Sequence, residues 1–427
     1  MTARISEYRL DGIYRQRQDG FFMQRVKLAA GVISASQARA VATAATRFGQ
    51  GTIHLTSRGS MEIHWLKEAD LPELKNFLAT VGLTSRGACG GAVRGVTCSS
   101  QGAAGFPALE SMACRLHRHF TANPRFERLP KKFKIGIEAD TVSRRHLIQD
   151  VGLVLAASEP SATSYDLYLA GGLGREPQPG FLFEAGVVEN RIIPLIEAIA
   201  RVYAAHTPAG KRLKHLIREI GEHEFRHLVA LEPTATEELP PVTGLPENLV
   251  PCSETTRIVA RVPAGELSSD QLTGLAGFAD SFGGGILMVT ADQDIAFHVS
   301  TVLDPAETEA ALKLAGFGES RVTFRVCPGS HQCLVGLTPT RDVAATVIAA
   351  MGPLARSLRW AISGCPNSCT QPQLADFGIV SSSLVKDDQG QRSPRFDLYR
   401  LGSEGLGNIV DCSLTLNGLC DRVREIG

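Results

Sequence analysis

The chain has 427 residues, of which 44% are hydrophobic, so it is long enough for two or three domains with ordinary cores. Lys plus Arg and Asp plus Glu each number 44, and this neutral balance argues against a general nucleic-acid or membrane-surface binder. No apolar run of roughly 18 residues and no signal-peptide pattern is visible. We therefore expect a cytoplasmic protein whose cysteines are thiols or metal ligands rather than disulfides.

The first segment predicts a strand, a serine-capped helix closed by a glycine, two further strands and a second helix. These elements are expected at Met23–Leu28, Ser36–Phe48, Thr52–Thr56, Met61–Trp65 and Leu71–Val81. The following region, residues 86–250, mixes strands and helices with many glycines and is typical of an α/β domain. Its proline-rich end, Glu232–Cys252, indicates a linker.

The first segment is then repeated, because residues 30–65 align without gaps with residues 264–299. Identical pairs include Ser34/Ser268, Gln37/Gln271, Phe48/Phe282 and His64/His298. The second copy predicts Ile258–Val262, a helix from a Ser268 or Ser269 cap to Phe282, Ile286–Thr290, Ile295–Val299 and Ala306–Leu314. The order of elements predicts an α+β sandwich with helices on one face of an antiparallel sheet. The two halves could pair into one pseudo-symmetric domain, and they differ in charge where Arg58 aligns with Asp292.

The last region, residues 318–427, again mixes strands and helices and contains four clustered cysteines in a C-x5-C pair and a C-x3-C pair. They are Cys327, Cys333, Cys365 and Cys369. Four thiolates are what a cubane iron–sulfur cluster needs. A structural zinc site remains an alternative, although zinc ribbons prefer shorter spacings, and so do four unrelated thiols. The other cysteines have no spacing that indicates a partner.

A family resemblance rests on these cysteines and on the residues after them. Ile362-Ser-Gly-Cys-Pro-Asn-Ser-Cys369, followed by Ala375-Asp-Phe-Gly-Ile-Val380, resembles the cluster signature of the siroheme-dependent sulfite/nitrite reductases. The resemblance extends over nearly the whole chain. It implies duplicated ferredoxin-like half-domains at 10–85 and 251–317, and two α/β hemoprotein-type domains at 86–250 and 318–427.

The resemblance also implies cofactors and site residues. Cys327, Cys333, Cys365 and Cys369 would hold a [4Fe–4S] cluster, and Cys369 would bridge to the iron of siroheme. Three segments resemble the family's anion-binding motifs: Thr56-Ser-Arg58-Gly, Val93-Arg94-Gly-Val-Thr and Leu129-Pro-Lys-Lys132-Phe-Lys134. They imply that Arg58, Arg94, Lys132 and Lys134 surround the substrate. Gly59 and Glu62 depart from the family, which often has glutamines there.

Further residues are implied, less specifically, to contact siroheme. They are Gly171 and Gly172 in a glycine loop, Lys211, Arg212 and Lys214, and Gln293 in the second repeat. The glycines could equally form a plain loop, and for the three cations an exposed helix face is the favoured alternative.

The resemblance implies a six-electron reduction of sulfite to sulfide, with Lys132 and Lys134 as candidate general acids. Nitrite reduction to ammonia is an alternative, but plant-type nitrite reductases resemble Lys-x-Asn where this chain has Lys132-Phe-Lys134. A precorrin-3B synthase-like enzyme and a non-catalytic iron–sulfur subunit also stay open. Because no flavin or nicotinamide motif is visible, we expect a separate donor such as a ferredoxin or a reductase subunit, with no nucleic-acid or membrane partner.

Overall fold

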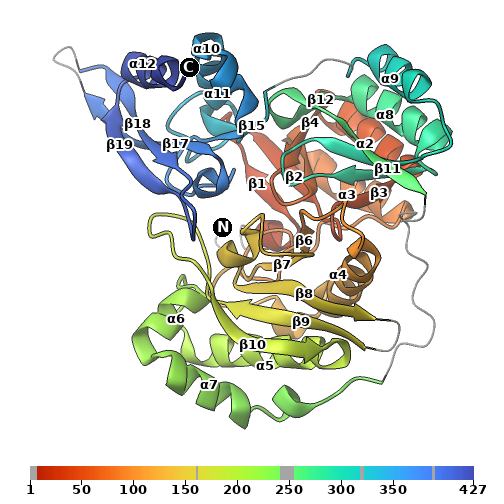
Figure 1. Ribbon diagram of the computed structural model, residues 1–427, viewed down its shortest axis with the longest axis vertical. Coiled ribbons are helices and arrows are strands. Elements are labelled where there is room, and N and C mark those ends of the chain that lie inside the picture. Colours follow the sequence, from red (N-terminus) through yellow and green to blue (C-terminus); the bar gives the residue numbers. More distant parts are fainter. Residues whose placement is uncertain (1–6, 160–161, 241–253, 318–321, 387–389) are drawn as a thin grey trace.

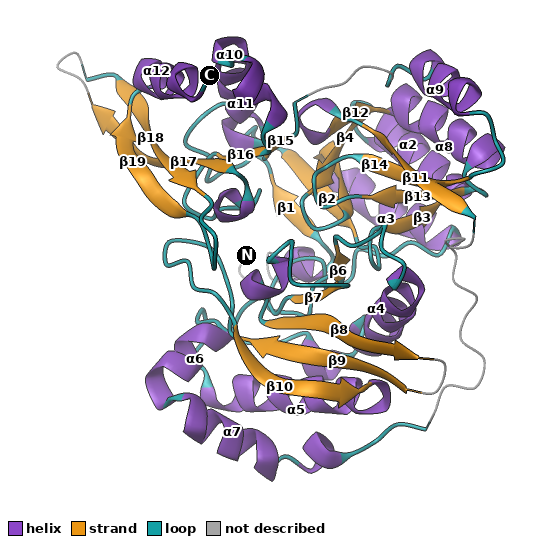
Figure 2. Cartoon of the chain, in the orientation of Figure 1, coloured by secondary structure: helices purple, strands orange, loops and turns teal. Residues whose placement is uncertain are grey.

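The computed structural model describes residues 7–427 apart from 160–161, 241–253, 318–321 and 387–389. Most of the predicted linker, including Cys252, lies outside the described residues. In the described part, the longer strands form four sheets, and three hydrophobic cores fill the half-domain pair, the first α/β domain and the C-terminal domain. Figures 1 and 2 show loops of these three parts meeting near the middle of the molecule.

The two repeats contain the predicted elements, with small shifts of their ends, and also three short strands that were not predicted from the sequence, β1, β3 and β12. The first contains β1 Ile13–Arg15, β2 Phe21–Val26, β3 Val32–Ser34, α2 Ala35–Phe48, β4 Thr52–Thr56, β5 Ser60–Lys67 and α3 Leu71–Thr80. The second contains β11 Thr255–Ala260, β12 Glu266–Ser268, α8 Ser269–Phe282, β13 Ile286–Val289, β14 Ile295–Ser300 and α9 Pro305–Leu314.

The halves exchange a strand. The sheet order β1–β2–β5–β4–β12 gives the first half a strand from the second, and β11–β14–β13–β3 returns one. The register pairs Leu267 with Ile53 and Leu287 with Ile33, and all four side chains are buried. The two halves therefore share a single core.

Helices α2 and α8 begin at equivalent serines. Ser34 and Ser268 each accept a hydrogen bond from the backbone N–H of a glutamine three residues on, and that glutamine side chain bonds back. These reciprocal capping boxes satisfy the first-turn donors. The helix begins at Ala35, one residue before the predicted start at Ser36, because Ser34 is the N-cap with the matching Gln37.

The first α/β domain has a mixed sheet, β6–β7–β8–β9–β10, whose first three strands are parallel. Its elements are β6 Thr97–Cys98, α4 Phe106–Phe120, β7 Ile135–Glu138, β8 Val151–Glu159, β9 Ala162–Leu169, β10 Phe181–Val188, α5 Glu189–His206, α6 Leu213–Ile220 and α7 Glu222–Leu231. A short 3-10 helix, η3 Arg145–Ile148, lies in the loop between β7 and β8.

The C-terminal domain repeats this topology in the order β15–β16–β17–β18–β19, again with three parallel strands first. Its elements are β15 Phe324–Val326, α10 Thr340–Ala350, α11 Pro353–Ser357, β16 Trp360–Ser363, β17 Phe377–Lys386, β18 Arg392–Arg400, β19 Asn408–Leu414 and α12 Leu416–Ile426. The duplication therefore includes the α/β domains as well as the half-domains.

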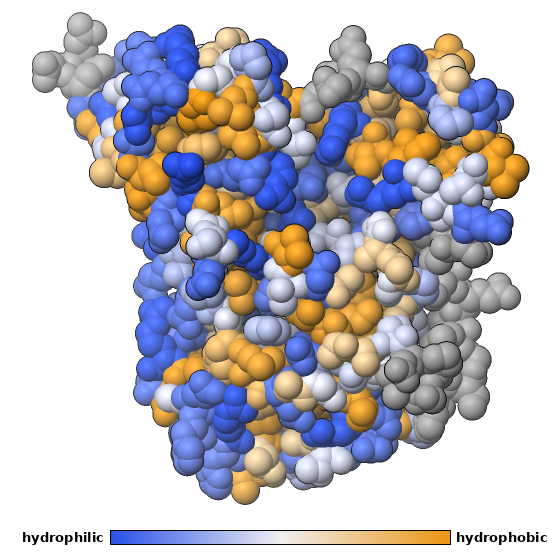
Figure 3. Space-filling model, viewed as in Figure 1, coloured by the Kyte–Doolittle hydropathy of each residue, from blue (hydrophilic) through white to orange (hydrophobic). Residues whose placement is uncertain are grey.

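None of the helices in the described residues is long and apolar enough to cross a membrane. On the face seen in Figure 3, apolar and polar residues are interspersed.

Candidate active site

Three of the four clustered cysteines follow strand ends of the C-terminal sheet. Cys327 comes directly after β15, while Cys365 and Cys369 lie in the loop after β16. Cys333 follows the short 3-10 helix η6 Gly329–His331. The thiols influence one another's ionisation, which places all four in one neighbourhood.

The loops that hold these cysteines are shaped by glycines and by hydrogen bonds to sulfur. The Gly364 N–H donates to Cys327 Sγ over 3.2 Å. Gly329 has a φ of +55°, and a Cβ there would lie 2.3 Å from Thr340 Oγ1, so only glycine fits. Burial raises the pKa of the Cys327 thiol, and raises that of Cys365 to about 11. Thiols of this kind ionise only against a strong positive charge, such as bound iron.

The donor set fits a cluster better than a single metal ion. Sulfur ligands of one zinc ion lie within about 4 Å of each other, given Zn–S bonds of about 2.3 Å. In the described part of the chain, no three His, Cys, Asp or Glu side chains converge tightly enough to hold one ion. Thiolates of a cubane each bind a different iron and stand farther apart. Four thiols in one neighbourhood match the ligand set of a [4Fe–4S] cluster, and their assignment as its ligands stays a prediction.

The four predicted substrate cations converge beside Cys369. Arg58 lies at the turn between β4 and β5, Arg94 follows the bridge residue Val93, and Lys132 and Lys134 flank Phe133, which bridges to Val93. The two lysines lie in the extended segment that leads into β7 and not on the strand itself, with Lys134 directly before the strand and Lys132 two residues earlier. Alternation across this segment still puts both on one side.

Burial and mutual repulsion weaken proton binding in this cluster. Burial lowers the pKa of Arg58 to about 9, and the charge of Arg94 adds to the shift. Burial also lowers the pKa of Lys132 to about 8, against the opposing effect of Cys369. The pKa of Lys134 falls well below its usual value through burial and then through Arg58 and Lys132. An anion placed among these cations would relieve the repulsion.

One donor in the cluster has no partner within the described residues. Arg94 Nη2 donates to Gly90 O over 2.8 Å and Tyr14 also lies close to the guanidinium, whereas the buried Nη1 has no acceptor within hydrogen-bond geometry. A buried, unpaired guanidinium nitrogen costs free energy unless a ligand accepts from it. The cation cluster therefore fits an anionic ligand.

The residues predicted to contact siroheme are engaged with protein groups. Arg212 Nη2 forms a buried ion pair with Asp150 Oδ2 at 2.8 Å, and Lys214 Nζ donates to the carbonyls of Gly172 and Glu176. A Cβ on Gly172 would lie 2.2 Å from Arg212 Nη1, so the glycine makes room for the ion pair.

The remaining predicted contacts are divided between packing and surface. A Cβ on Gly171 would lie 2.1 Å from Leu147 O, and Lys211 is exposed. Gln293 lies in the second hairpin with a φ of +67°, and its amide bonds to Leu55 O at 2.6 Å and to the backbone of Val326. Contacts between these residues and siroheme stay a prediction.

A cavity of about 750 Å³ lies beside the Cys365–Cys369 loop. It is lined by Gly174 and Arg175 of the first α/β domain and by residues of the C-terminal domain, among them Cys365, Ser368 and Tyr399. This cavity thus adjoins the predicted cluster loop.

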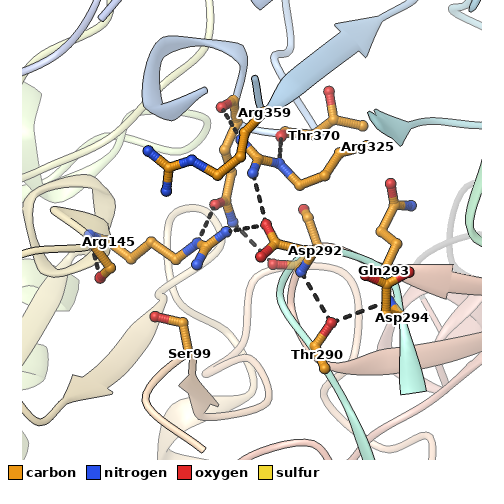
Figure 4. A network of polar contacts seen from close by, with 12 residues as sticks. Ser99, Arg145, Thr290, Asp292, Gln293, Asp294, Arg325, Arg359 and Thr370 are labelled. Carbon is orange, nitrogen blue, oxygen red and sulfur yellow. Dashed lines mark hydrogen bonds and ion pairs between the residues drawn. The ribbon is translucent and has the colours of Figure 1, made fainter. Parts of the chain in front are cut away.

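A polar network that the sequence did not indicate lies next to Cys369. Figure 4 shows Arg145 and Arg325 pointing toward Asp292, whose Oδ1 accepts from each at 2.8 Å. These guanidinium groups hold the pKa of the Asp292 carboxyl well below its usual value, against the effect of burial. Arg325 Nε also donates to Thr370 O at 2.8 Å. Asp292 therefore fastens the second hairpin to the loop of Cys369.

Comparison with known proteins identifies the class. The family model "Nitrite and sulphite reductase 4Fe-4S domain" matches residues 90–237, and "Nitrite/Sulfite reductase ferredoxin-like half domain" matches 14–81 and 255–313. The chain belongs to the nitrite and sulfite reductase family. It is an oxidoreductase of that family, and membership implies siroheme and a [4Fe–4S] cluster as cofactors. The four cysteines lie outside both matched ranges, so their individual roles stay predictions.

Two curated relatives illustrate the range of the family. The chain is 28% identical over 466 residues to a ferredoxin–nitrite reductase of Synechococcus elongatus, covering 98% of this chain and 89% of the relative. It is 24% identical over 442 residues to a "Sulfite reductase [ferredoxin] 2" of Mycolicibacterium paratuberculosis, covering 93% and 79%. The solved structure of the NirA protein of Mycobacterium tuberculosis matches with a TM-score of 0.82 at 23% identity, covering 98% of this chain and 85% of that chain. That match shows a shared fold.

Proposed function

We propose that this protein reduces sulfite to sulfide, with electrons from a separate donor. The observation that carries the proposal is the half-buried pair Lys132 and Lys134 beside Arg58 and Arg94. Sulfite has three oxygens and carries up to two negative charges, so it gains more from a fourth cation than nitrite does. Similarity to a relative named as a sulfite reductase supports the same substrate.

The chemistry consumes six electrons and six protons, and three oxygens leave as water. Siroheme and the cluster, when bound, supply the iron that takes the sulfur and the path for single electrons. The protein binds and orients the anion: Arg94 Nη1 and the Arg58 guanidinium stabilise charge on the substrate oxygens. The Nζ atoms of Lys132 and Lys134, whose pKa values are lowered, can donate protons to those oxygens more readily than ordinary ammonium groups.

Cys369 is the proposed bridging thiolate, and a ferredoxin is the proposed electron donor. The donor proposal rests on the printed names of both curated relatives, which refer to ferredoxin. Nitrite is the second candidate substrate, favoured by the Synechococcus relative.

The deciding experiment compares both anions in the Lys134→Asn variant. Asparagine keeps a hydrogen-bond donor but removes the charge. A charge-assisted hydrogen bond contributes roughly 1.5–3 kcal/mol, so its loss should lower kcat/KM by about one to two decades. We expect that loss for sulfite and a smaller loss, or a gain, for nitrite. Rates are measured with a chemical reductant and normalised to siroheme content. Equal losses for the two anions would show that Lys134 does not select sulfite.

A further inference from the structure

Two loops at the centre of the molecule are related by the internal duplication. One connects β7 to β8 and the other connects β16 to β17, and both strand pairs are parallel. Asp150 ends the first loop and accepts from Lys134 N at 2.9 Å, while Asp376 ends the second and accepts from Arg359 N at 2.8 Å. Counting back five residues from each aspartate gives Arg145 in the first loop and Gln371 in the second.

These equivalent residues meet, and they belong to a closed ring of hydrogen bonds. Arg58 Nη1 donates to Gln149 Oε1 at 2.9 Å, and Gln149 Nε2 donates to Arg145 O at 3.1 Å. Arg145 Nε then donates to Gln371 Oε1 at 3.1 Å, and Gln371 Nε2 donates to Ser57 O at 3.0 Å. The ring closes because Ser57 precedes Arg58.

The ring is attached to the loop of the predicted bridging cysteine. Ser57 Oγ donates to Cys369 O at 2.7 Å, and Gln371 is only two residues beyond Cys369. Gln371 has a φ of +58°, a conformation that costs a non-glycine residue free energy. Its two amide bonds help to stabilise that conformation, since both partners are themselves held in the ring.

The ring fixes the direction of each carboxamide. Gln149 and Gln371 are 2% and 5% exposed, and each uses both its oxygen and its nitrogen. Gln149 therefore presents its oxygen to Arg58. A Cβ on Gly136 would lie 2.8 Å from Gln149 Cγ. The Gln149 side chain therefore fits beside β7 only because residue 136 is a glycine.

Burial and repulsion explain why Arg58 needs such a support. Burial disfavours its charge most and the charges of Arg94 and Arg25 disfavour it further, so displacement of the guanidinium from the pocket would relieve both effects. Gln149 Oε1 and Gly95 O each accept from it at 2.9 Å. These two acceptors oppose that displacement at no cost in net charge.

We propose that Gln149 and Gln371 are positioning residues that hold the Arg58 guanidinium in a fixed place relative to the loop of Cys369. The inference rests on the proposed function in one respect, namely that Arg58 binds the anionic substrate. The two glutamines act through Arg58 and contact no substrate themselves.

The test is a double-mutant cycle on the holoenzyme with Gln149→Met and Arg58→Ala. The readout is the dissociation constant of sulfite and of nitrite, from the change in visible absorption on binding, so turnover is not needed. We expect Gln149→Met to raise the constant about tenfold, as loss of one hydrogen bond to a charged group implies. In the Arg58→Ala background the same change should have less than about a twofold effect. Gln371→Met should behave in the same way.

Controls separate positioning from stability. Gln24→Met removes another fully buried glutamine, outside the ring, and should leave the dissociation constants unchanged. If Gln149→Met does not fold, Gln149→Asn keeps the amide but withdraws the acceptor by one methylene and serves in the same cycle.

Additive effects of Gln149→Met and Arg58→Ala would overturn the proposal, as would unchanged binding in Gln149→Met. So would an unmutated protein that binds neither anion. If it binds an anion but does not turn over sulfite, the proposed substrate fails while the cycle still decides the role of the glutamines.

Discussion

Arg58 and Asp292 occupy the same position of the duplicated hairpin and carry opposite charges. The first contributes to a pocket of cations, and the second forms ion pairs with Arg145 and Arg325 next to that pocket. The carboxylate offsets one of these two positive charges, so the two arginines add less to the repulsion near the predicted cluster loop. The two copies of the hairpin therefore differ in role: Arg58 belongs to the cation cluster, and Asp292 pairs with the arginines beside it.

The first residue-scale prediction concerns the cysteines. Cys369→Ser should lose or misplace siroheme as well as damage the cluster, whereas Cys327→Ser should mainly destroy the cluster, because only Cys369 is expected to bridge. Siroheme and iron contents of anaerobically purified variants, with visible spectra, measure the difference. Normal siroheme and full activity in Cys369→Ser would rule out the bridging role.

The second residue-scale prediction concerns Asp292. Replacement by Asn leaves the fully buried Arg325 without its counter-charge, which costs about 3 kcal/mol of unfolding free energy for a buried pair. Urea unfolding monitored by circular dichroism measures it. Asp270→Asn, at an exposed position of α8, is the matched control and should change stability by only a few tenths of a kcal/mol. Equal stability of both variants would contradict the role given to Asp292.

The candidate site could be predicted only where residues follow a recognisable spacing. The four cysteines and the cations Arg58, Arg94, Lys132 and Lys134 stand in short motifs, and the structure brings them into one region. Gln149 and Gln371 carry no such signal. A buried glutamine acquires its role from partners far away in the chain, and Gln149 lies 91 residues from Arg58.

Short elements decide how the parts are joined. Arg144, just before η3, donates to the carbonyls of Gly402 and Gly405 in the C-terminal domain. Arg145, the first residue of η3, belongs to the ring of hydrogen bonds and donates to Gln371. Ile148, at the end of η3, packs with Leu173 and Leu374 in a small apolar cluster between the two domains. One turn of 3-10 helix therefore connects the first α/β domain to the C-terminal domain.

The element-scale prediction concerns pH and His146 of η3. This residue is 3% exposed, its ring lies 4.6 Å from that of Tyr168, and burial lowers its pKa to about 4. Between an unfolded pKa near 6.5 and about 4, the unfolded chain binds more protons than the folded protein. Stability should therefore fall as the pH drops through this window, by roughly 2 kcal/mol from this group by pH 5 and by more at lower pH.

His146→Phe keeps an aromatic ring and removes the titration. The drop in thermal midpoint between pH 7.5 and pH 5 should be smaller in this variant than in the unmutated protein. His223→Phe, at an exposed histidine, should keep the full drop. An identical drop in His146→Phe would show that η3 does not contribute to acid sensitivity.

For the whole molecule, the sequence predicts one level of duplication and misses the other. Half-domain copies retain capping serines, glycines and hairpin residues, because those positions are fixed by backbone geometry. The α/β domains share a sheet order but differ in the residues that shape their loops, as Arg145 and Gln371 show. In the α/β domains the topology depends on strand pairing, and many different apolar residues support strand pairing equally well. The two domains can therefore keep one sheet order without a visible sequence repeat.

The whole-molecule prediction tests the shared core. Leu267 lies in the second repeat but pairs with Ile53 of the first, and both are buried. Leu267→Ala should cost about 3 kcal/mol and lower amide hydrogen-exchange protection in β4 as much as in β11 and β14. Unchanged protection in β4 would show that the halves unfold independently.

The reciprocal exchange of β3 and β12 also bears on descent. In a symmetric dimer of a single ancestral half, each copy would lend its short strand to the other by the same operation. Fusion of two such genes preserves the exchange within one chain, which is the arrangement seen here. Copies within one chain can differ, as Arg58 and Asp292 do in the two hairpins here. A symmetric dimer, by contrast, would carry the same charge on both sides of its axis.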